Sequence, residues 1–186
     1  PMASGSHRDP RTISACTQDR SESSSSVAEL AVLAIARPAG DGDVQDLAQL
    51  LVEAETEMSS QRGGTALLAS HDRAPSASDS VLSALRDVDT MVWCGVWEGA
   101  VVGYSIARTS NEGDSVIVTV TDLYTTPQAR DVGIGEALLE AAIAWAIGID
   151  ALAIDAHALP GARESKNLFE RLGLTARLIT VRRNLR

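Results

Sequence analysis

The chain has 186 residues, of which 45% are apolar, and this is enough for one compact domain with a core. Its formal net charge is −9, and Lys166 is the only lysine. Because nucleic-acid backbones are bound by clustered basic side chains, this balance argues against a nucleic-acid partner. It is compatible with a cationic substrate.

Cysteine spacing and hydropathy predict a cytoplasmic protein. Cys16 and Cys94 are far apart, one in a polar stretch and one in an apolar run. This pattern fits neither a disulfide framework nor a metal-ligand cluster, so we expect no metal. No run reaches the ~18 apolar residues of a membrane-spanning helix, and the N-terminus lacks the apolar segment of a secretory signal. We therefore expect no membrane partner.

The first part of the chain differs in composition from the rest. Residues 1–27 are polar, rich in serine and without periodicity, so they bury too little apolar surface to offset their ordering entropy. We predict a disordered or extended tail over residues 1–27 and a single domain over residues 28–186.

The first half of this domain alternates apolar runs with turn signals. The patterns predict a strand at 30–36 stopped by Pro38 and then a helix at 44–56 with Asp43 as N-cap. An irregular connection at 59–80 and a short helix at 80–88 follow. A hairpin is predicted at 91–110, turning at Glu98-Gly99, and a third strand at 115–126. The irregular connection is of the kind that often borders a site. Aromatic side chains alternate along the hairpin at Trp93, Trp97 and Tyr104, a pattern more typical of core than of substrate stacking.

The pattern in the second half of the domain predicts a helix, a strand, a second helix and a last strand. The first helix has Ile134, Leu138, Ala141 and Trp145 at helical spacing. A short apolar run at 151–156 is typical of a strand buried on both faces. An amphipathic helix at 162–173, closed by Gly173, precedes a last alternating strand at 176–183. The whole order indicates an α/β domain.

Two glycines lie one residue apart where the third strand gives way to a helix. The backbone N–H groups of the first helical turn have no partners within the helix and, with the helix dipole, form an anion site. Gly133 and Gly135 would let a diphosphate approach the backbone, and Arg130 would add a charged hydrogen bond. The alternative is that both glycines only ease tight packing between strand and helix. A Walker loop would need Gly-Lys-Ser/Thr, and the dinucleotide fingerprint needs a small residue where Leu138 stands.

The segment PQARDVGIGEALL, residues 127–139, resembles the R/Q-x-x-G-x-G/A signature of the GCN5-related N-acetyltransferase (GNAT) superfamily. LFERLGL at 168–174 resembles the LYEKLGF segment of that superfamily, ITVRRNL at 179–185 its closing strand, and ARPAGDGDVQDLAQL at 36–50 its opening strand and helix. The resemblance implies the acyl-CoA N-acyltransferase fold, a mixed, mostly antiparallel, splayed sheet flanked by helices.

The resemblance also implies acetyl-CoA as cosubstrate. The backbone of residues 123–125 would pair with the pantetheine arm like an added strand, and the amides of residues 131–136 would hold the diphosphate. The thioester would lie where the strands at 115–126 and 151–156 splay apart. The implied cofactor-binding residues are Leu123, Tyr124, Thr125, Arg130, Asp131, Val132, Gly133, Ile134, Gly135, Glu136, Ala137, Asn167 and Phe169. The carboxylates of Asp131 and Glu136 would either weaken cofactor binding or favour the helix N-terminus through the dipole.

The usual catalytic groups of the superfamily are replaced. Phe169 stands where a tyrosine acid is usual, and Thr119 and Thr121 stand where a glutamate or histidine base is usual. Threonine is no base at neutral pH, so we expect deprotonation through water with a threonine relay. The catalytic candidates are Thr121 and His157, the latter at the start of a loop after a strand.

These features predict an N-acetyltransferase in which a primary amine of a cationic small molecule or peptide attacks acetyl-CoA directly. The first alternative is a CoA-binding or protein-interaction module with weakened catalysis. The second is a nucleotide-binding domain of another kind, because a Gly-x-Gly turn is generic. A homodimer is compatible with the sequence.

Overall fold

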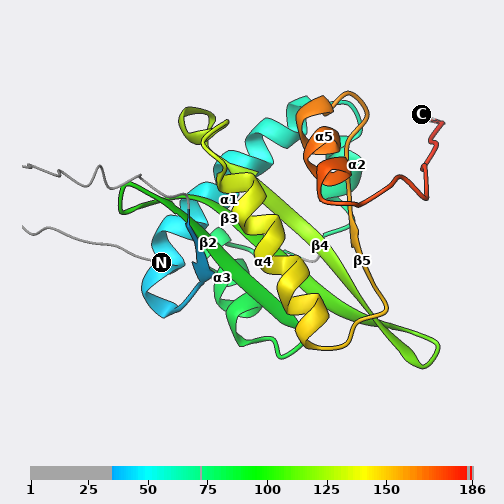
Figure 1. Cartoon of the computed structure of the whole chain (residues 1–186). Coiled ribbons are helices and arrows are strands. Elements are labelled where there is room, and N and C mark those ends of the chain that lie inside the picture. The colour runs from blue at the N-terminus through cyan, green and yellow to red at the C-terminus, as the bar shows by residue number, and fades with distance from the viewer. Residues whose placement is uncertain (1–34, 72, 184, 186) are drawn as a thin grey trace, which may run out of the picture. The chain divides into compact units, whose positions relative to one another are not determined.

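A computed structural model describes residues 35–71, 73–183 and 185, so the predicted tail at 1–27 lies outside the described residues (Figure 1). The elements in chain order are β1 (Ile35–Pro38), α1 (Val44–Ser60), α2 (Gly64–Leu68), α3 (Ala77–Arg86), β2 (Thr90–Trp97), β3 (Ala100–Glu112), β4 (Ser115–Thr125), α4 (Ile134–Gly148), β5 (Ala153–Ala156) and α5 (Arg163–Arg171). Short 3-10 helices lie at Asp41–Asp43 and Pro127–Ala129.

The five strands form one mixed sheet in the order β1-β2-β3-β4-β5. β1 to β4 pair antiparallel, and β5 pairs parallel to β4. The β2–β3 hairpin turns at Glu98 and Gly99, whose φ values of 52° and 81° are those of a type I′ turn. The predicted mostly antiparallel α/β sheet is therefore confirmed.

β5 ends part-way along β4. Their pairing runs only from Ile117 opposite Ala153 to Val120 opposite Ala156, whereas β4 continues to Thr125. A bulge lies at the same point, because Ala107 of β3 pairs with Val120 but Ile106 pairs with Asp122. The extra residue, Thr121, bends β4 and increases its twist. The splay that the family resemblance implies thus begins at Thr121.

Helices cover both faces of the sheet. α1 and α3 pack on one face around a core that contains Leu47, Leu51 and Ile106. α4 crosses the other face, as Figure 1 shows, and buries Leu138 and Leu139 against β4. Its hydrophobic residues at helical spacing explain this position.

Two strand predictions fail at the far side of the sheet. Residues 176–183 form no strand, although their apolar residues alternate as predicted, and Leu178, Ile179 and Val181 are 82–89% exposed. An alternating pattern specifies which side chains share a face but supplies no partner strand. β5 is not buried on both faces, because it is the edge strand and Ala153 and Asp155 are exposed.

Smaller differences concern helix boundaries and one cap. α1 extends to Ser60, α3 begins at Ala77 behind the N-cap Ser76, and the connection predicted as irregular contains α2. Asp43 occupies the N-cap position of α1, but its carboxylate accepts bonds from Arg37 (2.6 and 2.8 Å) and the Gly40 N–H (2.9 Å) instead of capping that helix. The arginine bonds hold the pKa of Asp43 down at about 2.

The close contact of α4 with β2 generates a stability prediction. A Cβ added at Gly95 would lie 2.6 Å from Cγ2 of Ile134, which is 1% exposed and cannot move aside. We expect Gly95→Ala to lower the free energy of unfolding by about 1–3 kcal/mol through overpacking, measured by urea denaturation. The control is Gly148→Ala in α4, where a Cβ meets nothing within 4 Å. That variant should be neutral or slightly stabilising, and an unchanged Gly95→Ala protein would contradict the packing described.

Candidate functional site

A cleft of about 870 Å³ opens where β4 leaves β5. Its walls come from the end of α1 and the segment after it, the second half of β4, the loop before α4, the first turn of α4, the loop after β5, and α5. The lining includes Val120 to Thr125 on β4 and His157 just after β5. The splay of the two strands is therefore the origin of the cleft.

The first turn of α4 presents its backbone to this cleft. Gly133 and Gly135 both line it, and Gly133 caps the helix with a φ of 91°. The first amide with a partner in the helix belongs to Ala137, which donates to the Gly133 carbonyl (3.0 Å), so the N–H groups of residues 134–136 have none within the helix. An anion at this end would meet these donors and the positive end of the dipole.

The two glycines have different roles in the fold. Gly133 adopts a positive φ that favours glycine, whereas a Cβ added at Gly135 would lie 3.3 Å from Cδ2 of Leu168 on α5. Gly135 thus eases packing between α4 and α5, which differs from the strand-to-helix packing of the alternative interpretation. Both positions also leave the backbone accessible from the cleft.

Arg130 is held on the cleft wall by α1. Its Nη2 donates to both carboxylate oxygens of Glu57 (2.8 and 2.6 Å), and its Nε donates to the Thr125 carbonyl (3.2 Å). The side chains of Arg130 and Glu57 are about one-third exposed. A diphosphate at α4 would therefore meet an arginine whose charge is already shared with a carboxylate.

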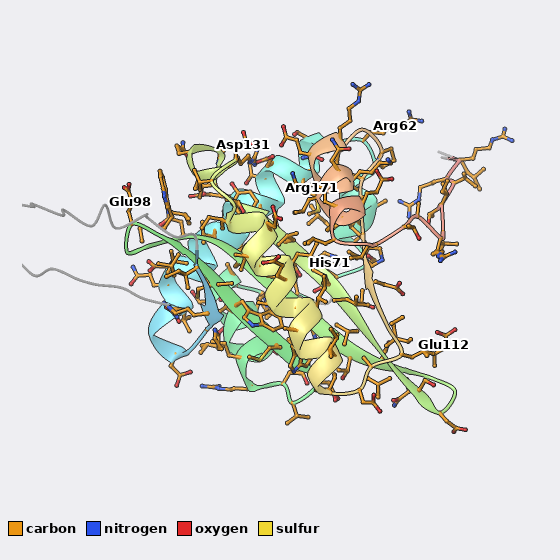
Figure 2. The ribbon with its side chains drawn as sticks, in the orientation of Figure 1. Arg62, His71, Glu98, Glu112, Asp131 and Arg171 are labelled. Atoms are coloured by element: carbon orange, nitrogen blue, oxygen red, sulfur yellow. The ribbon has the colours of Figure 1, made fainter. Side chains whose placement is uncertain are left out.

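The two acidic residues of this loop and helix differ in their surroundings. Glu136 lies 3.3 Å from Arg171 of α5, which offsets part of its charge at the helix N-terminus. Asp131 is exposed and has a φ of 66°, which is uncommon for a residue with a side chain. Figure 2 shows Asp131 on the loop before α4 and Arg171 on α5, at the same end of the domain.

Most of the residues predicted for the site come together at this cleft. Those that line it are Thr121, Leu123, Tyr124, Thr125, Arg130, Asp131, Gly133, Gly135, Glu136, His157 and Phe169. Val132, Ile134, Ala137 and Asn167 are not among the lining residues. The Ile134 side chain is buried in the core, and Asn167 is exposed on α5.

A polar cluster lies at the base of the cleft around Asp122, which is 6% exposed. Its carboxylate accepts bonds from Arg73 and from the Thr121 hydroxyl (2.8 Å). Arg73 also donates to Glu55 on α1 (3.0 Å) and lies 3.3 Å from Nδ1 of His71. The bulge at Thr121 allows two successive residues of one strand to join the same network.

Burial sets the protonation states next to this network. Burial lowers the pKa of His71, with a smaller contribution from the positive charge of Arg73, so the imidazole is neutral near neutral pH. Its Nε2 is buried and has no partner among the described residues. Burial also raises the pKa of Tyr104, and the phenol that lines the cleft keeps its proton.

Sequence reasoning missed the contribution of residues 57–73. This stretch supplies Glu57, Arg62, His71 and Arg73 to the cleft or to the network at its base. The connection at 59–80 was predicted to border a site, but no residue in it was identified, and Glu57 lies before it in α1. The stretch has little periodicity, and its partners, Asp122 on β4 and Arg130 in the loop before α4, are 49 and 73 residues away in the chain. Tyr104 was assigned to the core, and it is buried there while also lining the cleft.

Two further properties concern only the described part of the chain. None of its helices is both long and apolar enough to cross a membrane. Within 35–71, 73–183 and 185, no group of three or more His, Cys, Asp or Glu side chains could hold a metal ion.

The Acetyltransferase (GNAT) family matches the chain over residues 45–174, which is more than half of its length. The chain belongs to the GNAT family. Membership supports acetyl transfer as its class of reaction and a CoA-derived cosubstrate. No curated protein matches the chain in sequence.

Solved structures share this fold at low sequence identity. A tetramutant of the BH1408 protein from Bacillus halodurans has a TM-score of 0.66 and 18% identity, over 81% of this chain and 99% of the other. The enzyme AAC(6')-Iy, in complex with the bisubstrate analogue CoA-S-monomethyl-acetylneamine, has a TM-score of 0.61 and 16% sequence identity. The match covers 81% of this chain and 98% of the other. A ribosomal-protein-alanine N-acetyltransferase from Brucella melitensis has a TM-score of 0.61 and 15% sequence identity, and the match covers 82% of this chain and 99% of the other. These likenesses establish the GNAT fold of this chain.

The burial of His71 generates a prediction for stability against pH. Because the folded pKa lies below the ordinary value of 6.5, the unfolded chain binds a proton below pH 6.5 that the folded chain does not. The contribution of His71 to the free energy of unfolding should therefore fall as the pH drops below 6.5 and stay constant above it. Urea denaturation of the wild type and of His71→Gln across this range measures the effect. The variant should lose part of the pH dependence, and parallel curves for the two proteins would contradict a buried neutral His71.

Proposed function

We propose that this GNAT protein transfers an acetyl group from acetyl-CoA to a primary amine. The observation that carries the proposal is the opening between β4 and β5 directly beside the first turn of α4, within one cleft. An acyl-CoA needs both features, because its diphosphate and its thioester lie at opposite ends of the pantetheine arm.

The backbone of the cleft fits an extended cosubstrate. The amides of residues 134–136 are available to a diphosphate, and residues 123–125 of β4 lie beyond the last pair with β5. Peptide groups of the pantetheine arm would pair with this stretch of β4 in the manner of an added strand. The acetyl group would then lie near Val120 and Thr121, at the base of the opening.

The proposed reaction is direct attack of the amine nitrogen on the thioester carbonyl carbon. The C–N bond forms, the C–S bond breaks, CoA leaves as its thiolate, and the nitrogen loses a proton. His157 lines the cleft just beyond the last β4–β5 pair and is proposed to accept this proton through water. The Thr121 hydroxyl, which donates to Asp122 (2.8 Å), would accept a hydrogen bond from that water and so hold it in the relay.

The source of the thiolate's proton differs from the usual tyrosine of the superfamily. Phe169 lines the cleft but has no hydroxyl. Tyr124 lies on the same cleft lining, and burial with the nearby charge of Glu57 raises its pKa, so its phenol is protonated. Solvent or Tyr124 would supply the proton.

The acceptor is proposed to be a cationic small molecule or peptide. The net charge of −9 would draw a cation toward the protein. Glu57, Asp122 and Glu136 already pair with arginines, so among the described cleft residues the carboxylates that remain for an ammonium group are those of Asp131 and Glu164. The name of AAC(6')-Iy with its acetylneamine analogue points to a small-molecule amine, and the name of the ribosomal-protein-alanine N-acetyltransferase points to a protein amine. The proposal therefore includes both small molecules and peptides as acceptors.

A CoA-binding module with weakened catalysis is the second candidate. It is favoured by the replacement of the usual acid by Phe169 and of the usual base by Thr119 and Thr121. General acid and base catalysis contribute only about 10²–10⁴-fold each, so their loss slows transfer without abolishing it. Release of free CoA in the presence of a panel of primary amines distinguishes the two candidates.

Calorimetric titration with acetyl-CoA tests the cosubstrate site. We expect the wild type to bind and Gly133→Asp to lose binding by at least about tenfold, because the new carboxylate meets the diphosphate. The matched control is Gly99→Asp in the β2–β3 turn, where the φ of 81° imposes a backbone strain similar to that at Gly133 (91°). This control should bind as the wild type does.

The outcomes separate the alternatives. Equal loss of binding in both glycine variants would assign the effect to strain. Absence of acetyl-CoA binding in a folded wild-type protein would contradict the proposal and leave packing as the role of the two glycines.

A further inference from the structure

Two tyrosines from neighbouring strands form part of the cleft wall on the α1 side of the sheet. Tyr104 of β3 pairs with Tyr124 of β4 in the strand register, and their ring centroids lie 6.2 Å apart at an angle of 47°. Both residues line the cleft, and both pack with the core cluster that contains Leu47 and Leu51 of α1. The rings therefore lie on the face of the sheet opposite to α4, whose amides are proposed to hold the diphosphate.

The inner ring of this pair, Tyr104, is 2% exposed, and its hydroxyl forms no hydrogen bond with a described residue. Burial raises the pKa of this phenol, the charges of Asp122 and Glu55 raise it further, and Arg73 opposes them. Two carboxylates and one guanidinium therefore lie near the ring, with one negative charge in excess. A buried polar group without a protein partner is usually completed by a ligand or water, and Tyr104 lines the cleft.

The outer ring, Tyr124, is partly exposed and has a similar balance of charge. Burial raises its pKa, the charges of Glu57 and Glu53 raise it further, and Arg130 opposes them. Glu57 pairs with Arg130, so the excess charge is that of Glu53. The Glu53 carboxylate accepts a bond from the neutral amide of Gln49 (3.1 Å) and forms no ion pair within the described part of the chain. A positive charge over the Tyr124 ring would be attracted by the ring face and by this carboxylate.

We propose that the tyrosine pair binds a second positive charge of the acceptor, and that the acceptor is a linear diamine or polyamine. This inference rests on the proposed acetyl transfer for the position of the attacked amine, which would lie near Thr121. Tyr124 follows three residues later on β4, a distance of about 10 Å along an extended strand. A flexible chain of that length between two ammonium groups reaches both positions.

The cleft is bridged on its α1 side, which favours a slender acceptor. Gly63 is the N-cap of α2 with a φ of 87°, and a Cβ added there would lie 3.6 Å from Cδ2 of Leu159 and 3.6 Å from Cδ of Pro160. The turn between α1 and α2 thus contacts the loop after β5, and Arg62, Leu159 and Pro160 all line the cleft. A linear chain passes beside such a contact, whereas a branched ring system would have to part the two segments.

Calorimetric titration with 1,7-diaminoheptane and with 7-aminoheptan-1-ol tests the site for the second charge. The two probes have equal length and differ in one ammonium group. Both are titrated into the free protein and into the protein saturated with CoA, where no acetyl group is present to be transferred. We expect the wild type to bind the diamine at least about tenfold more tightly than the amino alcohol. We call this ratio of dissociation constants the diamine preference.

Four substitutions separate the ring face, the nearby carboxylate and the overall charge. Tyr124→Leu and Glu53→Gln should each lower the diamine preference at least about threefold, whereas Tyr124→Phe retains a ring face and should keep it. The matched control is Asp114→Asn, which removes one negative charge on the β3–β4 hairpin at the far end of β4. This control should leave the diamine preference unchanged.

The outcomes distinguish this site from general attraction and from the proposed function. Equal binding of the two probes by the wild type, or equal losses in Glu53→Gln and Asp114→Asn, would overturn the inference. A loss in Tyr124→Phe as large as in Tyr124→Leu would also overturn it, because the hydroxyl and not the ring face would be responsible. A protein that shows the diamine preference but binds no CoA would support this site and contradict the proposed function. A protein that binds CoA without the preference would contradict this inference alone.

Discussion

The bulge at Thr121 is the constraint on which the rest of the site depends. One extra residue in β4 shifts the register with β3 between Val120 and Asp122, and the parallel pairing with β5 ends at Val120. Without that separation, the second half of β4 would be covered by a neighbouring strand and no backbone would face the cleft. The first turn of α4 lies beside Thr125, since a Cβ at Gly135 would be 3.9 Å from the Thr125 Oγ1, so it meets the opening from one side.

Ion pairs attach the segments on the α1 side of the cleft to β4 and to the loop that follows it. Glu57 of α1 binds Arg130, and Glu55 binds Arg73, which in turn binds the buried Asp122. Exposed pairs of this kind contribute little to stability, and buried ones are offset by desolvation. Their effect is on position, because they fix the end of α1 and the segment after it against the base of the cleft. They also neutralise carboxylates that would otherwise repel a diphosphate.

The sequence predicted features that depend on neighbouring residues better than those that depend on distant ones. The Glu98-Gly99 turn, the α4 stripe and the Arg130 to Gly135 motif are local, and the structure contains each turn and helix near its predicted place. The bonds of Arg73 to Asp122 and of Arg130 to Glu57 join residues far apart in the chain, and no local pattern reveals them. The strand expected at 176–183 failed for a similar reason, since a strand needs a partner that the pattern of these residues does not specify.

The central claim is that the opening beside α4 holds an acyl-CoA along the backbone of β4. Amide chemical shifts recorded during a titration with CoA test it most directly, because they report on individual N–H groups. The account predicts that the largest changes occur at residues 123–125 and 133–137, with little change at the β2–β3 turn. Changes confined to other parts of the chain, or no change at saturating CoA, would contradict it.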